Sequence, residues 1–253
     1  MRDIVLALGF LTRLPVPILE AENEDLAEST RAYPIAGLFV GIASLLALAL
    51  GAWAFTRPIG AIFAVGAALL ITGGLHLDGL ADCIDGYLCN GNAERRLAVM
   101  HDPRVGGLGA AWIALWLMLK ICLVYATIEV GTATTALWCA PILARAPLAW
   151  ELWWGKPVTP GRGLFGHLSP HVGREEVLLS LASGLVLCVP ALWPIGDSLL
   201  RFGLAVAGCV IVTLAWSRLW AALLGGLNGD VLGGAVELRE MAVLLAMALV
   251  LRA

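Results

Sequence analysis

Long apolar stretches separated by short polar segments dominate the hydropathy pattern of this chain. Most of them are close to the roughly 20 residues that an α-helix needs to cross the hydrocarbon core of a bilayer. The pattern predicts an all-α, polytopic membrane helix bundle that forms one domain over residues 1–253. Six spans are expected, at residues 35–55, 59–75, 108–128, 132–150, 177–195 and 199–216. A short run at 241–251 gives a seventh span only if its helix begins near Asp230.

The composition agrees with a membrane location. Hydrophobic residues make up 60% of the chain and charged residues 14%, and the mean hydropathy is +0.89. Soluble domains usually carry about 25% charged residues. The sequence therefore predicts a protein whose partner is the lipid bilayer.

The distribution of basic residues predicts the orientation of the bundle. With six or seven crossings, the amino-terminal tail lies on the same side as the loops near 78–106 and 155–176 and the segment 225–240. Loops on the opposite side contribute only Arg57 and Arg201. By the positive-inside rule, the tail and the long polar loops are expected in the cytoplasm. The basic residues on the predicted cytoplasmic side are Arg2, Arg13, Arg31, Arg95, Arg96, Arg104, Lys156, Arg162 and Arg174.

The segment H-L-D-G-L-A-D-C-I-D-G at 76–86 is the first candidate for chemistry. If it is helical, Asp78, Asp82 and Asp85 fall within an arc of roughly 60° on one face. Three carboxylates so close repel one another, and a divalent cation would keep them ionised. Hard oxygen ligands favour Mg²⁺ or Mn²⁺ over zinc.

A second acidic segment, G-G-L-N-G-D-V-L-G-G-A-V-E-L-R-E, occupies residues 225–240. Its first glycines, including Gly229, suit a turn that exposes backbone N–H groups, and Asp230 is expected to cap the helix that follows. Glu237, seven residues later, returns to nearly the same helix face. The two acidic faces are predicted to meet on one side of the membrane and to hold one or two metal ions, as phosphoryl-transfer sites do.

Between these segments lies M-H-D-P-R-V-G-G-L-G, at 100–109. Arg104 supplies a positive charge beside Gly106, Gly107 and Gly109, where a phosphate could approach backbone amides and a helix N-terminus. Acidic, arginine and glycine elements together indicate a polyphosphate ester bound through a metal ion.

Two cations and a histidine fall within or next to predicted spans. A cation inside the bilayer costs at least about 2.5 to 3.5 kcal/mol, so Lys120 and Arg145 should face the bundle interior or reach an interface. Lys120 is expected to pair with a carboxylate or a substrate phosphate, and Arg145 is either a similar functional group or a helix-packing residue. His76 is either a ligand or base beside Asp78, or a hydrogen-bonded interface residue.

Gly37 and Gly41 form a G-x-x-x-G pattern in the first predicted span. Small residues at this spacing let two membrane helices approach closely. The alternative is a chance pattern in a glycine-rich helix.

Several motifs together resemble the cobalamin synthase family, the adenosylcobinamide-GDP ribazoletransferases. They are F-L-T-R-L-P-V-P at 10–17, Y-P-I-A-G-L-F-V-G at 33–41, G-G-L-H-L-D-G-L-A-D-C-I-D-G at 73–86, D-P-R-V-G at 102–106 and G-D-V-L-G-G-A-V-E-L at 229–238. The resemblance implies a multi-pass enzyme of the bacterial inner membrane with its active site facing the cytoplasm. It would join α-ribazole or its 5′-phosphate to adenosylcobinamide-GDP and release GMP with Mg²⁺. No nucleic-acid partner is implied, and a homo-oligomer stays open.

Residues and resemblance together predict the roles of the site residues. Asp82, Arg104 and Lys120 are the candidate catalytic residues, with Arg104 and Lys120 offsetting charge on the departing GMP. One carboxylate, not assigned, would take the proton of the attacking hydroxyl. The expected metal ligands are Asp78, Asp82, Asp85, Asp230 and Glu237, and the expected substrate-binding residues are His76, Arg104, Arg145 and Gly229.

Two other function classes remain as alternatives. A CDP-alcohol phosphatidyltransferase-like lipid enzyme also uses spaced aspartates at a membrane surface, but its usual pattern carries an A-R pair shortly after D-G, and no A-R pair closely follows the D-G pairs of this sequence. An ion-coupled transporter would use Lys120, Arg145 and the carboxylates as an ion pathway. The acidic residues gather at one edge of the predicted spans rather than at their middle, which speaks against a transporter.

Overall fold

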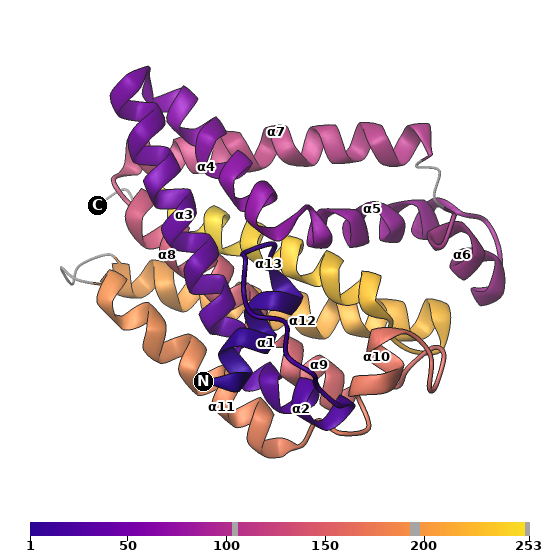
Figure 1. Cartoon of the computed structure of the whole chain (residues 1–253). Coiled ribbons are helices and arrows are strands. Elements are labelled where there is room, and N and C mark those ends of the chain that lie inside the picture. The colour runs from indigo at the N-terminus through magenta and orange to yellow at the C-terminus, as the bar shows by residue number, and fades with distance from the viewer. Residues whose placement is uncertain (103–105, 193–197, 251–253) are drawn as a thin grey trace.

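The computed structural model describes residues 1–102, 106–192 and 198–250, and places them in a bundle of α-helices (Figure 1). The predicted all-α membrane-bundle class is confirmed. In these residues, the helices are α1 (Arg2–Leu11), α2 (Asn23–Glu28), α3 (Tyr33–Ala54), α4 (Arg57–Thr72), α5 (Leu75–Leu88), α6 (Ala93–Met100), α7 (Gly107–Val130), α8 (Ala133–Arg145), α9 (Leu148–Trp154), α10 (Gly163–Leu168), α11 (Arg174–Cys188), α12 (Ser198–Leu224) and α13 (Gly229–Ala248). Two 3₁₀ turns, η1 (Ser29–Ala32) and η2 (Val189–Leu192), precede α3 and follow α11.

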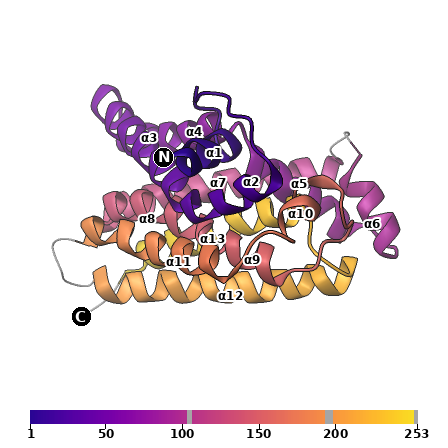
Figure 2. The ribbon, with the colours of Figure 1, turned by 60° about the horizontal axis from the view of Figure 1, so that its bottom comes forward.

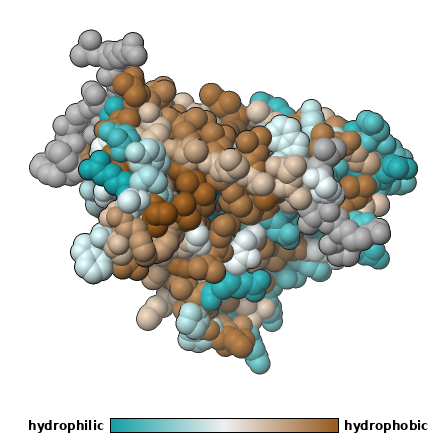
Figure 3. Space-filling view, turned by 90° about the horizontal axis from the view of Figure 1, so that it is seen from above, coloured by the Kyte–Doolittle hydropathy of each residue, from teal (hydrophilic) through white to brown (hydrophobic). Residues whose placement is uncertain are grey.

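Four segments of the described chain are long and apolar enough to cross a membrane. They overlap four of the six predicted spans, and many of their large apolar side chains are exposed on the surface of the bundle. Figure 3 shows one such face, where hydrophobic residues cover the middle and hydrophilic residues gather toward the edges. Exposed apolar surface of this extent is suited to lipid rather than water. The four segments are Asn23–Ala54, Gly109–Val130, Arg174–Leu192 and Leu199–Leu224.

The predicted span at 59–75 is the first half of a bent pair of helices. Helix α4 ends at Thr72, with Gly73 as its C-cap, and α5 runs at an angle of 90° to it. Gly73 and Gly74 have φ angles of 62° and 74°, a left-handed conformation that glycine adopts without steric cost. The two helices have the length and composition of a span only when taken together, which gives up to five spans in the described chain.

The predicted span at 132–150 is divided into two short helices. Helix α8 has 13 residues and α9 has seven, each shorter than a membrane crossing requires. Pro147 is the N-cap of α9 and lacks the N–H that a continuing helix would need, so the break falls at this residue.

Helix α13, the expected seventh span, is instead the core of the bundle. It runs for 20 residues, 14 of them buried, and packs against α5, α7, α8 and α12. Figure 1 shows α13 surrounded by these helices, and Figure 2 shows α12 running along one side. Because it carries three buried charged residues, its surroundings must supply partners for them. Those residues are Glu237, Arg239 and Glu240.

The G-x-x-x-G pattern makes the close contact that the sequence predicts. A Cβ atom on Gly37 would lie 2.3 Å from the carbonyl oxygen of Pro141 on α8, and one on Gly41 would lie 2.8 Å from that of Leu137. Helices α3 and α8 therefore touch through their backbones.

The two ends of the bundle differ in the elements that they carry. Helices α6 and α10 and the beginning of α13 lie at one end (Figure 1). The α3–α4 and α7–α8 connections and the end of α13 lie toward the opposite end. The arrangement brings the polar loops and the start of α13 to the same end, where the acidic segments can meet.

Replacing Gly37 by alanine tests the close packing of α3 on α8. The new methyl group must displace backbone atoms of α8, so we expect the folded state to lose about 1–3 kcal/mol. The matched control is Gly66→Ala on α4, where a Cβ meets nothing within 4 Å. The measurement is the thermal unfolding temperature of both variants in one detergent. Equal unfolding temperatures would contradict this contact.

Candidate active site

Helix α5 carries the three aspartates and lies directly against the beginning of α13. A Cβ atom on Gly79 would lie 2.8 Å from the Asp230 carbonyl oxygen and 3.3 Å from Gly233 Cα. Such close backbone contact places Asp230 beside the α5 aspartates, as the sequence predicts. The half-buried Asp82 carboxylate experiences the negative charge of Asp230, Asp78 and Asp85. The structure thus joins acidic residues that are about 150 positions apart in the chain.

The position of Asp230 is fixed by its neighbour Asn228. The Asn228 side chain accepts a hydrogen bond from Val231 N–H (3.0 Å) and donates one to Asp230 Oδ2 (2.9 Å). The N-cap of α13 is therefore Asn228, and the expectation that Asp230 caps the helix is wrong. The reason is that the helix begins at Gly229, two residues earlier than an Asp230 cap would require, so that Asp230 lies in its first turn. Burial raises the pKa of Asp230, and Asp78 adds to this rise, while His101 and Asn228 oppose it.

Asp85 faces the glycines at the start of α7. Its Oδ2 atom accepts a hydrogen bond from Gly106 N–H at 3.0 Å, and a Cβ on Gly109 would lie 2.5 Å from its Oδ1. Gly106, one of the glycines expected to bind a phosphate, thus donates its N–H to the Asp85 carboxylate instead. Arg104, the predicted catalytic cation of this loop, lies outside the described residues.

The donor chemistry of this cluster fits a magnesium ion. Asp78, Asp82, Asp85 and Asp230 all offer carboxylate oxygens. In the described chain, neither Asp78 nor Asp82 accepts a hydrogen bond from a protein donor. No three His, Cys, Asp or Glu side chains among the described residues converge closely enough to hold an ion by themselves. Mg²⁺ usually takes one or two carboxylates and completes its coordination with substrate phosphates and water. A pair of these aspartates with a bound diphosphate would meet that requirement.

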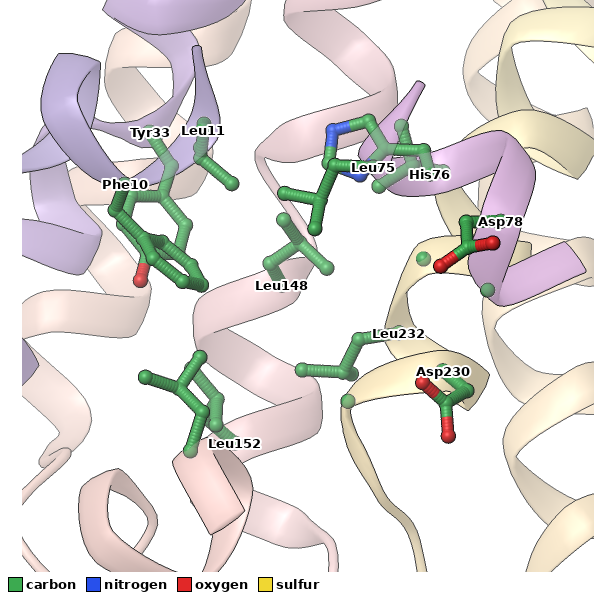
Figure 4. Close-up of a pocket in the computed structure, with 15 residues that line it drawn as sticks. Phe10, Leu11, Tyr33, Leu75, His76, Asp78, Leu148, Leu152, Asp230 and Leu232 are labelled. Carbon is green, nitrogen blue, oxygen red and sulfur yellow. The ribbon is translucent and has the colours of Figure 1, made fainter. Parts of the chain in front are cut away.

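A cavity of about 220 Å³ opens beside Asp78 and Asp230. Figure 4 shows these two carboxylates at one side, the rings of Phe10 and Tyr33 at the opposite side, and leucines between them. His76 and Gly229, two predicted substrate-binding residues, also line it. The apolar wall was not apparent from the sequence, because its residues come from α1, α3, α9 and α13.

A polar cleft of about 650 Å³ adjoins this cavity. Both are lined by Leu164, Gly229 and Asp230, so Asp230 stands where they meet. The cleft also has His101 and Arg162 on its walls. The site therefore has one mostly apolar compartment and one compartment, the polar cleft, whose walls also carry charged and other polar side chains, around a shared carboxylate.

Glu237 belongs to a different cluster, farther along α13. Its Oε2 atom accepts hydrogen bonds from Lys120 Nζ (2.9 Å) and Trp116 Nε1 (3.0 Å) of α7. Lys120 Nζ also donates to Glu240 Oε2 at 2.6 Å. The structure does not bring Glu237 to the α5 aspartates, because Lys120 holds it against α7. Of the two predicted partners for Lys120, the structure provides the carboxylate.

Arg145 and Arg239 complete this buried network. Arg145 of α8 donates to Glu240 Oε1 (2.9 Å) and to the Pro141 carbonyl oxygen (2.9 Å). Arg239 pairs with Glu151 of α9 and donates to the Ala144 carbonyl oxygen (2.7 Å). Lys120 and Arg145 thus pair with the buried carboxylates of α13, and Glu237 is one of these carboxylates.

The sequence reasoning missed part of this network. Glu151, Arg239 and Glu240 were not singled out, although the rule that intramembrane charges need partners applies to Glu151 as it does to Arg145. Glu151 also accepts a hydrogen bond from Ser217 Oγ of α12 at 3.0 Å. His76 is buried, and its Nε2 atom has no partner in the described part of the chain.

Comparisons with known proteins find one family, which matches almost the whole chain. The model of the cobalamin-5-phosphate synthase family matches residues 3–248. An adenosylcobinamide-GDP ribazoletransferase of Alkalilimnicola ehrlichii is 39% identical over 99% of this chain and 96% of its own length. Enzymes with the same name from Pseudomonas entomophila (37% identical, 96% of this chain, 97% of its own) and Desulfitobacterium hafniense (34%, 97% and 96%) are similar over comparable lengths. No solved structure matches the chain.

Replacing Glu240 by glutamine tests the buried network. The change leaves Arg145 without an anionic partner in the core, so we expect the free energy of unfolding to fall by about 3–5 kcal/mol. The control is Glu129→Gln, which removes an exposed ion pair with Arg57 (3.6 Å) and should cost at most about 1 kcal/mol. Thermal unfolding of both variants in one detergent measures the difference. Similar small losses for both would argue against the network as a stabilising feature.

Proposed function

The chain belongs to the cobalamin-5-phosphate synthase family and is an enzyme, and from that premise we propose that it is an adenosylcobinamide-GDP ribazoletransferase. Its substrates would be adenosylcobinamide-GDP and α-ribazole or α-ribazole 5′-phosphate. The observation that carries the proposal is the packing of Asp230 against the α5 aspartates, within a chain similar to these enzymes over nearly its full length. Family membership favours this reaction over a CDP-alcohol lipid transferase or an ion-coupled transporter.

The proposed reaction is a phosphoryl-type transfer. A ribose hydroxyl oxygen of the ribazole substrate attacks the phosphorus that carries adenosylcobinamide and forms a new P–O bond. The bond from that phosphorus to the bridging oxygen breaks, and GMP leaves with this oxygen on its phosphate. The hydroxyl proton passes to one of the site carboxylates. Catalysis of such a transfer depends mainly on positioning the two reactants and on stabilising the phosphate charge.

We propose that Asp82 and Asp230 hold Mg²⁺ together with the bound diphosphate, with Asp78 and Asp85 beside them. When bound, the ion would neutralise charge on the diphosphate. The protein residues have separate tasks: Asn228 fixes Asp230, Gly106 N–H orients Asp85, and Arg162 provides positive charge along the polar cleft. Arg104, at the same loop, is proposed to offset the charge of the departing GMP.

We also propose that the site faces the cytoplasm of a bacterial inner membrane. The proposal is supported by the end of the bundle at which α6, α10 and the beginning of α13 lie (Figure 1). The segments at that end contain Arg95, Arg96, Lys156 and Arg162, in line with the positive-inside rule. A cytoplasmic site would have direct access to a guanine-nucleotide substrate.

Replacing Asp82 by asparagine should reduce GMP release at least about 100-fold, because the amide cannot supply the negative charge that the site needs. The assay contains purified protein, adenosylcobinamide-GDP, α-ribazole 5′-phosphate and Mg²⁺, and GMP is quantified by chromatography. The control is Asp25→Asn on α2, an aspartate that pairs with Arg2 outside the site, and its rate should stay within about twofold. Comparable rates for the two variants would exclude Asp82 from the active site.

Removing divalent cations should abolish turnover reversibly. EDTA treatment is expected to stop GMP release, and added Mg²⁺ or Mn²⁺ should restore it, because both ions prefer oxygen ligands. Ca²⁺ at the same concentration serves as the matched control and should restore little activity, since it binds at longer distances and in more flexible geometry. Full activity in the presence of EDTA would contradict a metal-dependent site.

A further inference from the structure

The apolar cavity and the polar cleft, which meet at Asp230, have different linings, and each lining is suited to a different part of the substrates. We propose that the apolar cavity binds the flat aromatic base of the ribazole substrate, while the diphosphate of the second substrate lies in the polar cleft. The inference rests on the proposed function, since it names the place of each reactant within that same site. It goes beyond it by giving a role to α1 and α9, which carry none of the predicted site residues.

The cavity walls are suited to an apolar ring system. Phe10 of α1 and Tyr33 of α3 lie with their ring centroids 5.9 Å apart and form one end of the cavity. Leu148 and Leu152 of α9 and Leu232 of α13 cover its middle (Figure 4). Aromatic and leucine side chains are the usual lining of pockets that bind flat heterocycles.

The volume of the cavity fits a fused two-ring base. An apolar cavity of about 150 Å³ lined by leucine, isoleucine and phenylalanine is enough to bind one benzene molecule. The present cavity measures about 220 Å³, which leaves room for a second fused ring. Benzimidazole, the base class that ribazole carries, is such a two-ring system with little hydrogen-bonding capacity, so burial in this cavity would leave few polar groups unpaired.

The polar groups of the cavity lie where the ribose of such a nucleoside would be. Asp78 and Asp230 stand at the side opposite Phe10 and Tyr33 (Figure 4). A base inserted between the rings and leucines would therefore point its sugar hydroxyls toward the carboxylates. Asp230 also lines the polar cleft, where Arg162 provides a cationic side chain for phosphates. The hydroxyl and the phosphorus that it attacks would meet at Asp230.

The experiment compares Michaelis constants for the two substrates in the full-length protein. Phe10→Ala removes one aromatic wall, and we expect the KM for α-ribazole 5′-phosphate to rise about 10-fold. The KM for adenosylcobinamide-GDP should stay within about twofold, because its diphosphate lies in the other compartment. The matched control is Phe202→Ala on α12, a phenylalanine that is also partly buried but lies in a separate core cluster. It should change neither KM.

A second variant and a binding measurement keep the inference independent of folding and of turnover. Phe10→Leu keeps an apolar side chain at this position and should give a KM between those of the wild type and Phe10→Ala. Equilibrium dialysis with radiolabelled α-ribazole 5′-phosphate should show binding to wild type and to Phe202→Ala, and weakened binding to Phe10→Ala.

The outcomes separate failure of this inference from failure of the proposed function. An unchanged KM for α-ribazole 5′-phosphate in Phe10→Ala, or a rise only in the KM for adenosylcobinamide-GDP, would overturn the assignment of the cavity. Equal rises for both substrates would overturn it as well. If the wild-type protein releases no GMP but dialysis shows binding that depends on Phe10, the proposed reaction fails while the cavity keeps its assigned ligand.

Discussion

The burial of charged residues on α13 is the constraint on which the arrangement of the bundle depends. A charge taken out of water must find a partner, and every buried ion on this helix finds one on a different neighbour. Lys120 binds Glu237 from α7, Arg145 binds Glu240 from α8, and Glu151 of α9 pairs with Arg239. The orientation of α13 about its own axis is therefore specified by polar contacts rather than by apolar packing alone.

The fixed orientation of α13 has its chemical consequence at the amino end of the helix. There Gly79 of α5 meets the backbone of Asp230, a contact too close for any side chain at that position. Asn228 caps the helix and donates a hydrogen bond to the Asp230 carboxylate, which fixes its position. The buried ion pairs in the middle of α13 thus fix the helix, and the fixed helix holds the acidic cluster at its amino end in place.

The sequence predicted the elements that depend on local pattern better than those that depend on packing. Apolar length identified the four helical segments that are long enough to cross a membrane, the spacing of Asp78, Asp82 and Asp85 placed them on one helix, and the carboxylate partner of Lys120 was among the alternatives. The contact of Glu237 with α7 was not predictable. Helical periodicity places Glu237 on the same face as Asp230, but it does not determine which helix packs against that face. The break at Pro147 and the wall of the apolar cavity likewise depend on how distant segments pack.

The central claim is that Asp82 of α5 and Asp230 of α13 act on one divalent ion. The most direct test is a double-mutant cycle on Mn²⁺ affinity, measured by electron paramagnetic resonance with adenosylcobinamide-GDP present. If the two aspartates share an ion, Asp82→Asn and Asp230→Asn each weaken binding, and the double variant weakens it by much less than the product of the two effects. Multiplicative effects, or an Asp230→Asn variant that binds Mn²⁺ as tightly as the wild type, would contradict the claim.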